Sequence, residues 1–181
     1  MSIPVTTAQQ FRSFFPFVED WTRRKNISHH LQYIEFLYKI RQLHNPVSTT
    51  QSLLNKTIII EYFTVVEGIL DALLCQLSVN VDGDHPVPIE IDEYMNAGRL
   101  LELAKCYRII DDTVQSQLGQ IKDTRNRVHI KRPRRNRKLE YEEYSDDLLA
   151  QREKIFKEFL EHLWRQKCPD IQTAFPWPWK T

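Results

Sequence analysis

The sequence predicts an all-α fold, an up-and-down bundle of about five helices, on three observations. Apolar residues recur three and four positions apart in five successive stretches, which is the period of a helix with one buried face. The chain has only four glycines in 181 residues, too few for the tight turns of an all-β protein. Its composition, 41% hydrophobic and 27% charged, is that of a globular chain rather than a disordered one.

The first two predicted helices span about 27–44 and about 48–79. The first must end before Pro46, because proline lacks the N–H that a helix interior requires. The second opens with Ser and Thr residues, either of which can cap a helix. It is apolar around most of its circumference, so we expect it to be the central helix of the bundle.

Three further helices follow, at about 96–107, about 111–131 and about 146–167. Pro133 ends the second of them. The third begins after Ser145 with acidic residues in its first turn and basic residues near its end, in agreement with the helix dipole. Its apolar residues recur at helical spacing and should face the core: Leu148, Leu149, Ile155, Phe156, Phe159, Leu160 and Leu163.

The chain is most simply a single domain with two added ends. Residues 28–167 form the predicted bundle, and residues 1–27 are aromatic-rich and predict a strap or a short helix. Residues 168–181 alternate aromatic residues with proline, a pattern that predicts an irregular strap packed back on the bundle. No internal repeat divides the sequence.

Cysteine and histidine usage gives no sign of a metal, a cofactor or a disulfide framework. The cysteines are odd in number and far apart: Cys75, Cys106 and Cys168. Three histidines without ligand-spaced partners are interpreted as ordinary surface residues: His29, His30 and His162. The start of the chain lacks the pattern of a signal peptide, and acidic residues interrupt the longest apolar stretch, 58–77. We expect a cytoplasmic protein without a membrane span.

Positive charge is concentrated in one place. Residues 122–138 contain nine Lys and Arg against a single Asp. A run of basic residues usually forms a solvated surface, but here it directly follows the candidate site described next, so we interpret it as a contact for the RNA backbone. The predicted contact residues are Lys131, Arg132, Arg134, Arg135, Arg137 and Lys138.

Arg125 and His129 continue the apolar stripe of the predicted helix 111–131. At about 100° per residue they lie roughly 20° to either side of Leu118, with Asn126 on the flank of the same face. Their i, i+4 spacing makes the two side chains neighbours. Arginine binds phosphate through parallel hydrogen bonds, and histidine transfers protons near neutral pH. The pair therefore suits attack by a ribose 2′-hydroxyl on its phosphate, with no metal required.

A purely structural interpretation of the same residues is also open. Arg125 would extend to solvent from the helix end, and His129 would bond to a carbonyl oxygen. Acidic residues on one side of the second predicted helix, Glu61, Glu67 and Asp71, would either order Arg125 from below or form a plain exposed strip.

The order Arg-Asn-…-His at the end of a late helix, preceded by "LLELAKCYRIIDDTVQSQLGQIKDT" and by a long apolar helix, resembles the HEPN domain. The resemblance covers roughly residues 28–167. It implies a helical, metal-independent endoribonuclease of the toxin–antitoxin and anti-phage type, a homodimer whose two motifs form one cleft. Arg125, Asn126 and His129 then fall on the motif's Arg, polar neighbour and His, with fewer residues between Arg and His than most members have.

The leading hypothesis from the sequence is thus a cytoplasmic HEPN-type ribonuclease that cuts single-stranded or loop RNA and is controlled by an antitoxin or regulatory protein. The alternative is a non-catalytic HEPN-like module that binds RNA or a protein. A third possibility is an unrelated helical scaffold, a monomer in which Arg125 pairs with an internal carboxylate such as Glu61.

Overall fold

The computed structural model describes residues 3–79, 95–126, 143–170 and 175. Within these residues the ordered elements are helices and no strand occurs, which confirms the predicted all-α fold. In chain order the helices are α1 (Ala8–Arg12), α2 (Trp21–His44), α3 (Ser48–Val79), α4 (Ala97–Cys106), α5 (Asp112–Asn126) and α7 (Asp146–Lys167).

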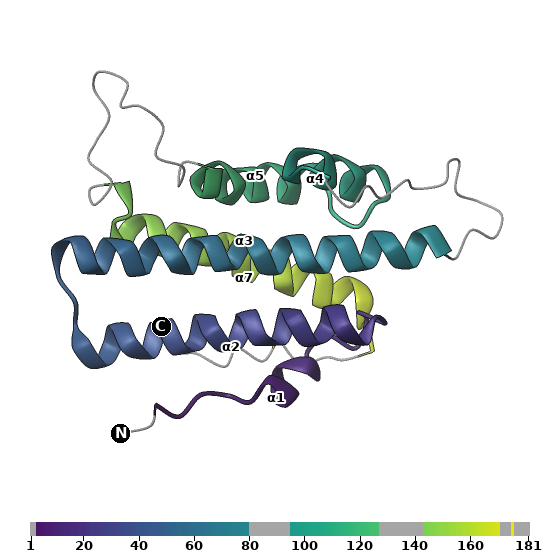
Figure 1. Cartoon of the computed structure of the whole chain (residues 1–181). Helices are drawn as coiled ribbons and strands as arrows, with labels where there is room; N and C mark the ends of the chain where they lie inside the picture. The colour runs from purple at the N-terminus through teal and green to yellow at the C-terminus, as the bar shows by residue number, and fades with distance from the viewer. Residues whose placement is uncertain (1–2, 80–94, 127–142, 171–174, 176–181) are drawn as a thin grey trace, which may run out of the picture.

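Helix α3 is the axis around which the other helices pack (Figure 1). It contacts α2, α4, α5 and α7, and Figure 1 shows α1 and α2 on one side of it with α4 and α5 on the other. Nine of its apolar side chains are completely inaccessible to solvent, as the apolar character of this segment predicts: Ile58, Ile59, Tyr62, Phe63, Val65, Val66, Ile69, Leu70 and Leu74. None of the helices in the described ranges combines the length and apolar character needed to cross a membrane.

Helix α2 begins at Trp21, six residues before the predicted start. Its N-cap is Asp20, whose carboxylate accepts a 2.7 Å hydrogen bond from the backbone N–H of Arg23. Trp21 is exposed and residues 22–26 are polar or basic, so this segment adds nothing to the apolar stripe from which the start was predicted. At the other end α2 stops at His44, as expected, and Asn45 adopts the left-handed conformation with φ of 40°.

The later helices match their predicted bounds closely. Asn96 caps α4, the Asp111 carboxylate accepts from the backbone N–H of Val114 at the start of α5, and Ser145 caps α7 as predicted. The structure describes α5 as far as Asn126, and the remainder of the predicted helix, 127–131, lies outside the described residues.

Both ends of the chain pack against the bundle in the part that the structure describes. The N-terminal segment contains a short helix, α1, with a capping box between Thr7 and Gln10. Phe175 is buried and its ring lies 5.7 Å from those of Phe14 and Trp164. One residue of the predicted tail therefore packs back as expected; most of the rest of that tail lies outside the described residues.

Candidate functional site

Arg125 lies in the last turn of α5, half-buried against the central helix. Its Nη2 lies 3.4 Å from Oε2 of Glu67 on α3, and its guanidinium carbon lies 5.7 Å from the centre of the Phe63 ring. The side chain keeps 38% of its surface exposed. The ring and the carboxylate thus hold the guanidinium in place, and its remaining N–H groups have no partner among the described residues.

The end of α5 is held by contacts from α7 and from the segment before it. Thr124 is buried, and its hydroxyl accepts a 3.0 Å hydrogen bond from Nε of Arg152. Arg152 also donates through Nη1 to Gln120, one turn earlier. The Tyr144 hydroxyl donates to the carbonyl of Thr124 at 3.4 Å. These contacts fix the turn that carries Arg125.

Of the other residues of the predicted site, the structure describes Asn126 but not the rest. Asn126 is the last residue of α5 and is exposed. His129 lies outside the described residues, and so does the whole predicted RNA contact: Lys131, Arg132, Arg134, Arg135, Arg137 and Lys138.

The acidic residues of α3 do not form a plain exposed strip, so that interpretation is wrong. Each carboxylate pairs with a basic side chain from another helix, and the most exposed of the three carboxylate side chains keeps 37% of its surface accessible. The pairs are His30–Glu61 at 2.7 Å, Arg125–Glu67 at 3.4 Å and Arg23–Asp71 at 2.8 Å. Glu67 orders Arg125, as one prediction allowed, whereas Glu61, the carboxylate suggested for an unrelated scaffold, pairs with histidine instead.

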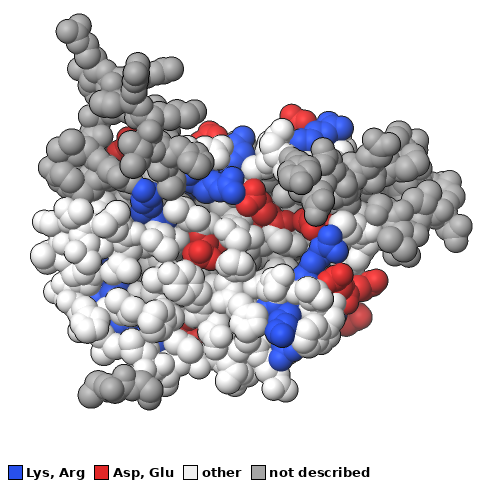
Figure 2. Space-filling view, in the orientation of Figure 1, with Lys and Arg blue, Asp and Glu red and all other residues white. Residues whose placement is uncertain are grey.

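The Arg23–Asp71 pair lines a groove of about 610 Å³ between α2, α3 and α4, and one member of each other pair, His30 and Glu67, lines it too. Thr64 and Gly68 line it from α3, His30 from α2 and Leu100 from α4. At Gly68 the two long helices approach closely, because a Cβ added there would lie 3.3 Å from Cγ1 of Ile27. Figure 2 shows acidic and basic side chains beside one another on this face of the molecule. The volume is within the range of small-ligand sites.

Two pKa shifts at the groove follow from these contacts. The hydrogen bond that His30 donates to Glu61 raises the pKa of His30 above 6.5, more than partial burial lowers it. Burial raises the pKa of Glu67, and the nearby charge of Arg125 acts in the opposite direction. His30 therefore carries a proton over a wider pH range than a free histidine does.

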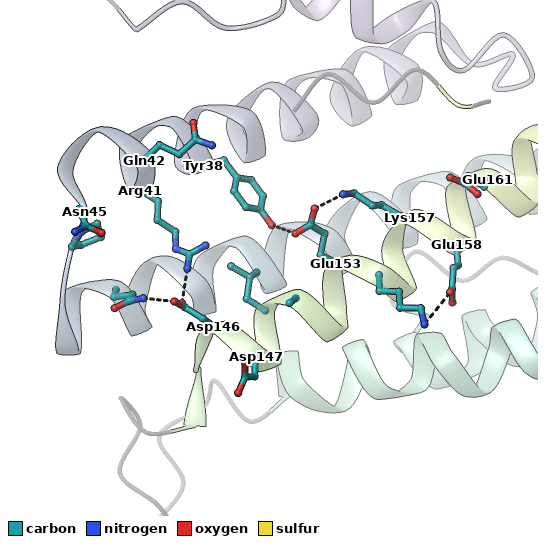
Figure 3. Close-up of a pocket in the computed structure, with 15 residues that line it drawn as sticks. Tyr38, Arg41, Gln42, Asn45, Asp146, Asp147, Glu153, Lys157, Glu158 and Glu161 are labelled. Atoms are coloured by element: carbon teal, nitrogen blue, oxygen red, sulfur yellow. Dashed lines mark hydrogen bonds and ion pairs between the residues drawn. The ribbon is translucent and has the colours of Figure 1, made fainter. Parts of the chain in front are cut away.

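A larger cleft of about 720 Å³ lies between α2 and α7 (Figure 3), and neither Arg125 nor Asn126 lines it. Its base is a buried polar network. The Tyr38 hydroxyl donates to Oε2 of Glu153 at 2.7 Å and lies 2.5 Å from the Tyr62 hydroxyl, while Lys157 pairs with Oε1 of the same carboxylate at 2.6 Å. The network joins α2, α3 and α7 through a carboxylate that is only 6% exposed.

Other charged residues that line this cleft also pair with residues of neighbouring helices. Arg41 of α2 lies 2.5 Å from Asp146 of α7, and Gln51 of α3 donates to the same carboxylate at 2.6 Å (Figure 3). Hydrogen bonds from Asn55 and Gln51 and the charge of Arg41 keep the pKa of Asp146 below its usual value despite its partial burial. Because its main charged groups already have partners, we interpret this cleft as a structural joint between helices.

The His30–Glu61 pair is the feature of the groove that the sequence analysis missed. His30 was interpreted as a surface histidine because it has no partner at ligand spacing along the chain. Its partner lies 31 residues away on another helix. The one available signal was Glu61 itself, a carboxylate within the most apolar helix of the chain, where an ionised group requires a partner.

Within the described ranges, no cluster of three or more His, Cys, Asp or Glu side chains is arranged to hold a metal ion. Comparisons with protein-family models, with curated proteins and with solved structures find no match for this chain.

Proposed function

We propose that this chain is a metal-independent endoribonuclease of the HEPN type that acts as a homodimer and serves as a toxin or defence effector. Its substrate would be single-stranded or loop RNA, and an antitoxin or regulatory protein would keep it inactive. The proposal assigns catalysis to Arg125, Asn126 and His129, and assigns RNA-backbone contact to the basic residues of 131–138.

The observation that carries the proposal is the placement of Arg125. The guanidinium is held between Glu67 and the Phe63 ring, yet it keeps 38% of its side-chain surface exposed and uses only Nη2 in its ion pair. A cation held in one place with open N–H groups is suited to neutralising charge on a phosphoryl oxygen, because the protein need not reorganise during the reaction.

The chemistry follows from the two types of side chain. His129 accepts the proton of the ribose 2′-hydroxyl, and O2′ attacks the adjacent phosphorus. The P–O5′ bond breaks with its electrons on O5′, which takes a proton from solvent and leaves as a hydroxyl, and the other fragment retains a 2′,3′-cyclic phosphate. Arg125 stabilises the negative charge that develops on the non-bridging oxygens during this step.

The test is cleavage of mixed RNA by purified protein in the presence and absence of EDTA. We expect wild-type protein to cleave equally well in both conditions, and we expect Arg125→Ala and His129→Ala to remain folded and inactive. Arg99→Ala is the matched control, because Arg99 lies on α4 in a surface ion pair with Glu102. Full cleavage by either site variant, or its loss with EDTA, would contradict the assignment.

A second candidate, a non-catalytic HEPN-like module that binds RNA or a protein, is favoured by one specific contact. Arg125 already has a counter-ion in Glu67, so its charge is partly neutralised in the free protein. In that case the same RNA would remain intact with wild-type protein, and Arg125→Ala would change only RNA binding or dimerisation.

A further inference from the structure

The solvent-facing side of α2 carries four exposed side chains at i, i+4 spacing, which we call the α2 row: Trp21, Lys25, His29 and Tyr33. Side chains four residues apart are neighbours on a helix surface, so the row is continuous and extends about 18 Å along the helix axis. Trp21 is 57% exposed and Tyr33 is 42% exposed. Among the residues that the structure describes, these two are the exposed aromatic side chains, and a single row contains both.

The cations beside Trp21 have no acidic partner. Arg12 of α1 and Lys25 of the row each lie 5.2 Å from the centre of the Trp21 ring. Neither side chain forms an ion pair with a carboxylate in the described ranges. An arginine or lysine that rests against an aromatic ring keeps its positive charge. Both charges therefore remain available to an anion from outside the protein.

The part of the chain that forms this surface has an excess of positive charge. Residues 3–44 contain six Lys and Arg against three Asp and Glu, whereas the whole chain has a net charge of only +1. None of the three acidic residues lies in the α2 row: Glu19 and Asp20 precede the helix, and Glu35 is 2% exposed and pairs with Lys39. Asp20 is further occupied by the hydrogen bond that caps α2. The charge of this face is thus complementary to that of a polyanion.

Exposed aromatic rings beside available cations suit a single-stranded nucleic acid. Its bases stack on aromatic side chains, and its phosphates follow the positive charge. The Tyr33 ring is stacked on Phe36, with 6.4 Å between the ring centres and 22° between the ring planes, and this contact orients it. A lipid surface would instead meet aliphatic side chains, and the exposed aliphatic residues that follow on the chain, Leu43 and Val47, lie beyond the row.

We propose that the α2 row is a docking surface for single-stranded RNA, with bases stacked on Trp21 and Tyr33 and with phosphates held by Lys25 and by Arg12 of α1. Helix α2 lies on the side of α3 opposite α5 (Figure 1), so this surface is separate from Arg125. The choice of RNA over DNA rests on the function proposed above. Binding at the row, in contrast, does not require that the protein cleave RNA.

The test measures binding to a labelled single strand of 2′-O-methyl RNA, which lacks the 2′-hydroxyl nucleophile and therefore stays intact with wild-type protein. Fluorescence anisotropy gives the affinity. We expect Trp21→Ala and Tyr33→Ala each to weaken binding about 5- to 150-fold, the range for the loss of one stacked base. Trp21→Phe and Tyr33→Phe keep an aromatic face and should retain most of the affinity. Leu43→Ala removes another exposed apolar side chain of α2, so it is the matched control and should bind normally.

Lys25→Gln gives an independent measurement. Loss of one phosphate contact should make the slope of log Kobs against log salt shallower by about 0.7, whereas Arg99→Ala on α4 should leave the slope unchanged. The duplex of the same sequence is the second probe. Its bases are already stacked on one another, so Trp21→Ala should not change its affinity.

Three results would overturn the inference. The first is wild-type affinity for the single strand in both alanine variants, with circular dichroism showing that they are folded. The second is a DNA strand that binds at the row when the RNA strand does not. The third is binding to phosphatidylserine vesicles, lost in Trp21→Ala, without binding to RNA, which would assign the row to a membrane surface.

The proposed ribonuclease function fails or stands separately. Protein that binds the strand through the α2 row and leaves normal RNA intact would contradict that function and support this inference. Protein that cleaves normal RNA, with wild-type affinity for the single strand in the Trp21 and Tyr33 variants, would do the opposite.

Discussion

Arg125 at the end of α5 contacts Glu67 near the middle of α3 through a single nitrogen, Nη2, at 3.4 Å. A bidentate arginine–carboxylate pair would be shorter and would engage both edges of the guanidinium fork. The observed contact instead anchors Arg125 while it leaves donors open. The strength of the Arg125–Glu67 pair indicates how far Arg125 serves to stabilise the fold. This strength can be measured as a coupling energy.

A double-mutant cycle of Arg125→Ala and Glu67→Gln should give a coupling energy of about 0.2–1 kcal/mol, because the guanidinium is more than one-third exposed and solvent screens the pair. The measurement is the free energy of unfolding in urea for the four proteins. The more exposed surface pair Arg99–Glu102, at 3.5 Å, is the control and should give a coupling energy at the lower end of this range. A coupling well above this range at Arg125 would identify a structural ion pair rather than an available cation.

The long apolar helices could be predicted from the sequence because their signals are local. The bounds of α3 and α7 match the prediction, since Ser145 is a good N-cap and Pro46 limits the turn before α3. The start of α2 was missed because this local apolar signal is absent from its first turns. Its first turns carry polar side chains, and only the cap at Asp20 marks the beginning.

The partners of the polar residues could not be predicted, because they depend on how far each helix is rotated about its axis and shifted along it. The sequence analysis placed Glu61, Glu67 and Asp71 on one side of α3, and in the structure Glu67 and Asp71 line the same groove. Which cation meets which carboxylate follows from the close approach of α2 at Gly68 and from the end position of α5. The periodicity of apolar residues along one helix does not specify how that helix is rotated or shifted relative to its neighbours.

The hydroxyl groups of Tyr38 and Tyr62, which form a buried network with Glu153, should contribute unequally to the free energy of unfolding. The proton of Tyr38 goes to Glu153, so Tyr62 must donate to Tyr38. Tyr62→Phe removes one donor and should cost about 0.5–1.5 kcal/mol. Tyr38→Phe leaves both Tyr62 and the carboxylate without this partner and should cost about 1–3 kcal/mol.

Urea denaturation of the two tyrosine variants measures this difference. Burial raises the pKa of both phenols, so neither variant should alter the pH dependence of stability around neutrality. Tyr33→Phe, on an exposed part of α2, is the control and should have little effect. The proposed direction of the hydrogen bonds is wrong if Tyr62→Phe proves the more destabilising of the two.

The His30–Glu61 pair should make stability depend on pH. The hydrogen bond to Glu61 raises the pKa of His30 in the folded protein above 6.5, so the folded state binds this proton more tightly than the unfolded chain. The resulting stabilisation is fully present below 6.5 and is lost as the pH rises through the folded-state pKa. The free energy of unfolding of wild type minus that of His30→Gln should therefore fall across this window.

NMR titration of the His30 ring measures the same pKa directly, and Glu61→Gln should return it toward its ordinary value. His29 provides the internal reference, because it lies next to His30 and shares no carboxylate with it among the described residues. If the pKa of His30 is the same in wild type and in Glu61→Gln, the contact does not persist in solution.

RNA binding should weaken steeply with salt if the basic residues of 131–138 contact the backbone. Each phosphate neutralised on a single strand contributes about −0.7 to the slope of log Kobs against log salt. Arg134→Ala and Arg135→Ala should each make the slope shallower by up to this amount, with similar losses for unrelated RNA sequences. Binding measured by fluorescence anisotropy at several salt concentrations gives these slopes, with His129→Ala protein, which the proposed function expects to leave the RNA intact. Arg99→Ala should leave the slope unchanged, and an unchanged slope in the Arg134 and Arg135 variants would remove 131–138 from the RNA interface.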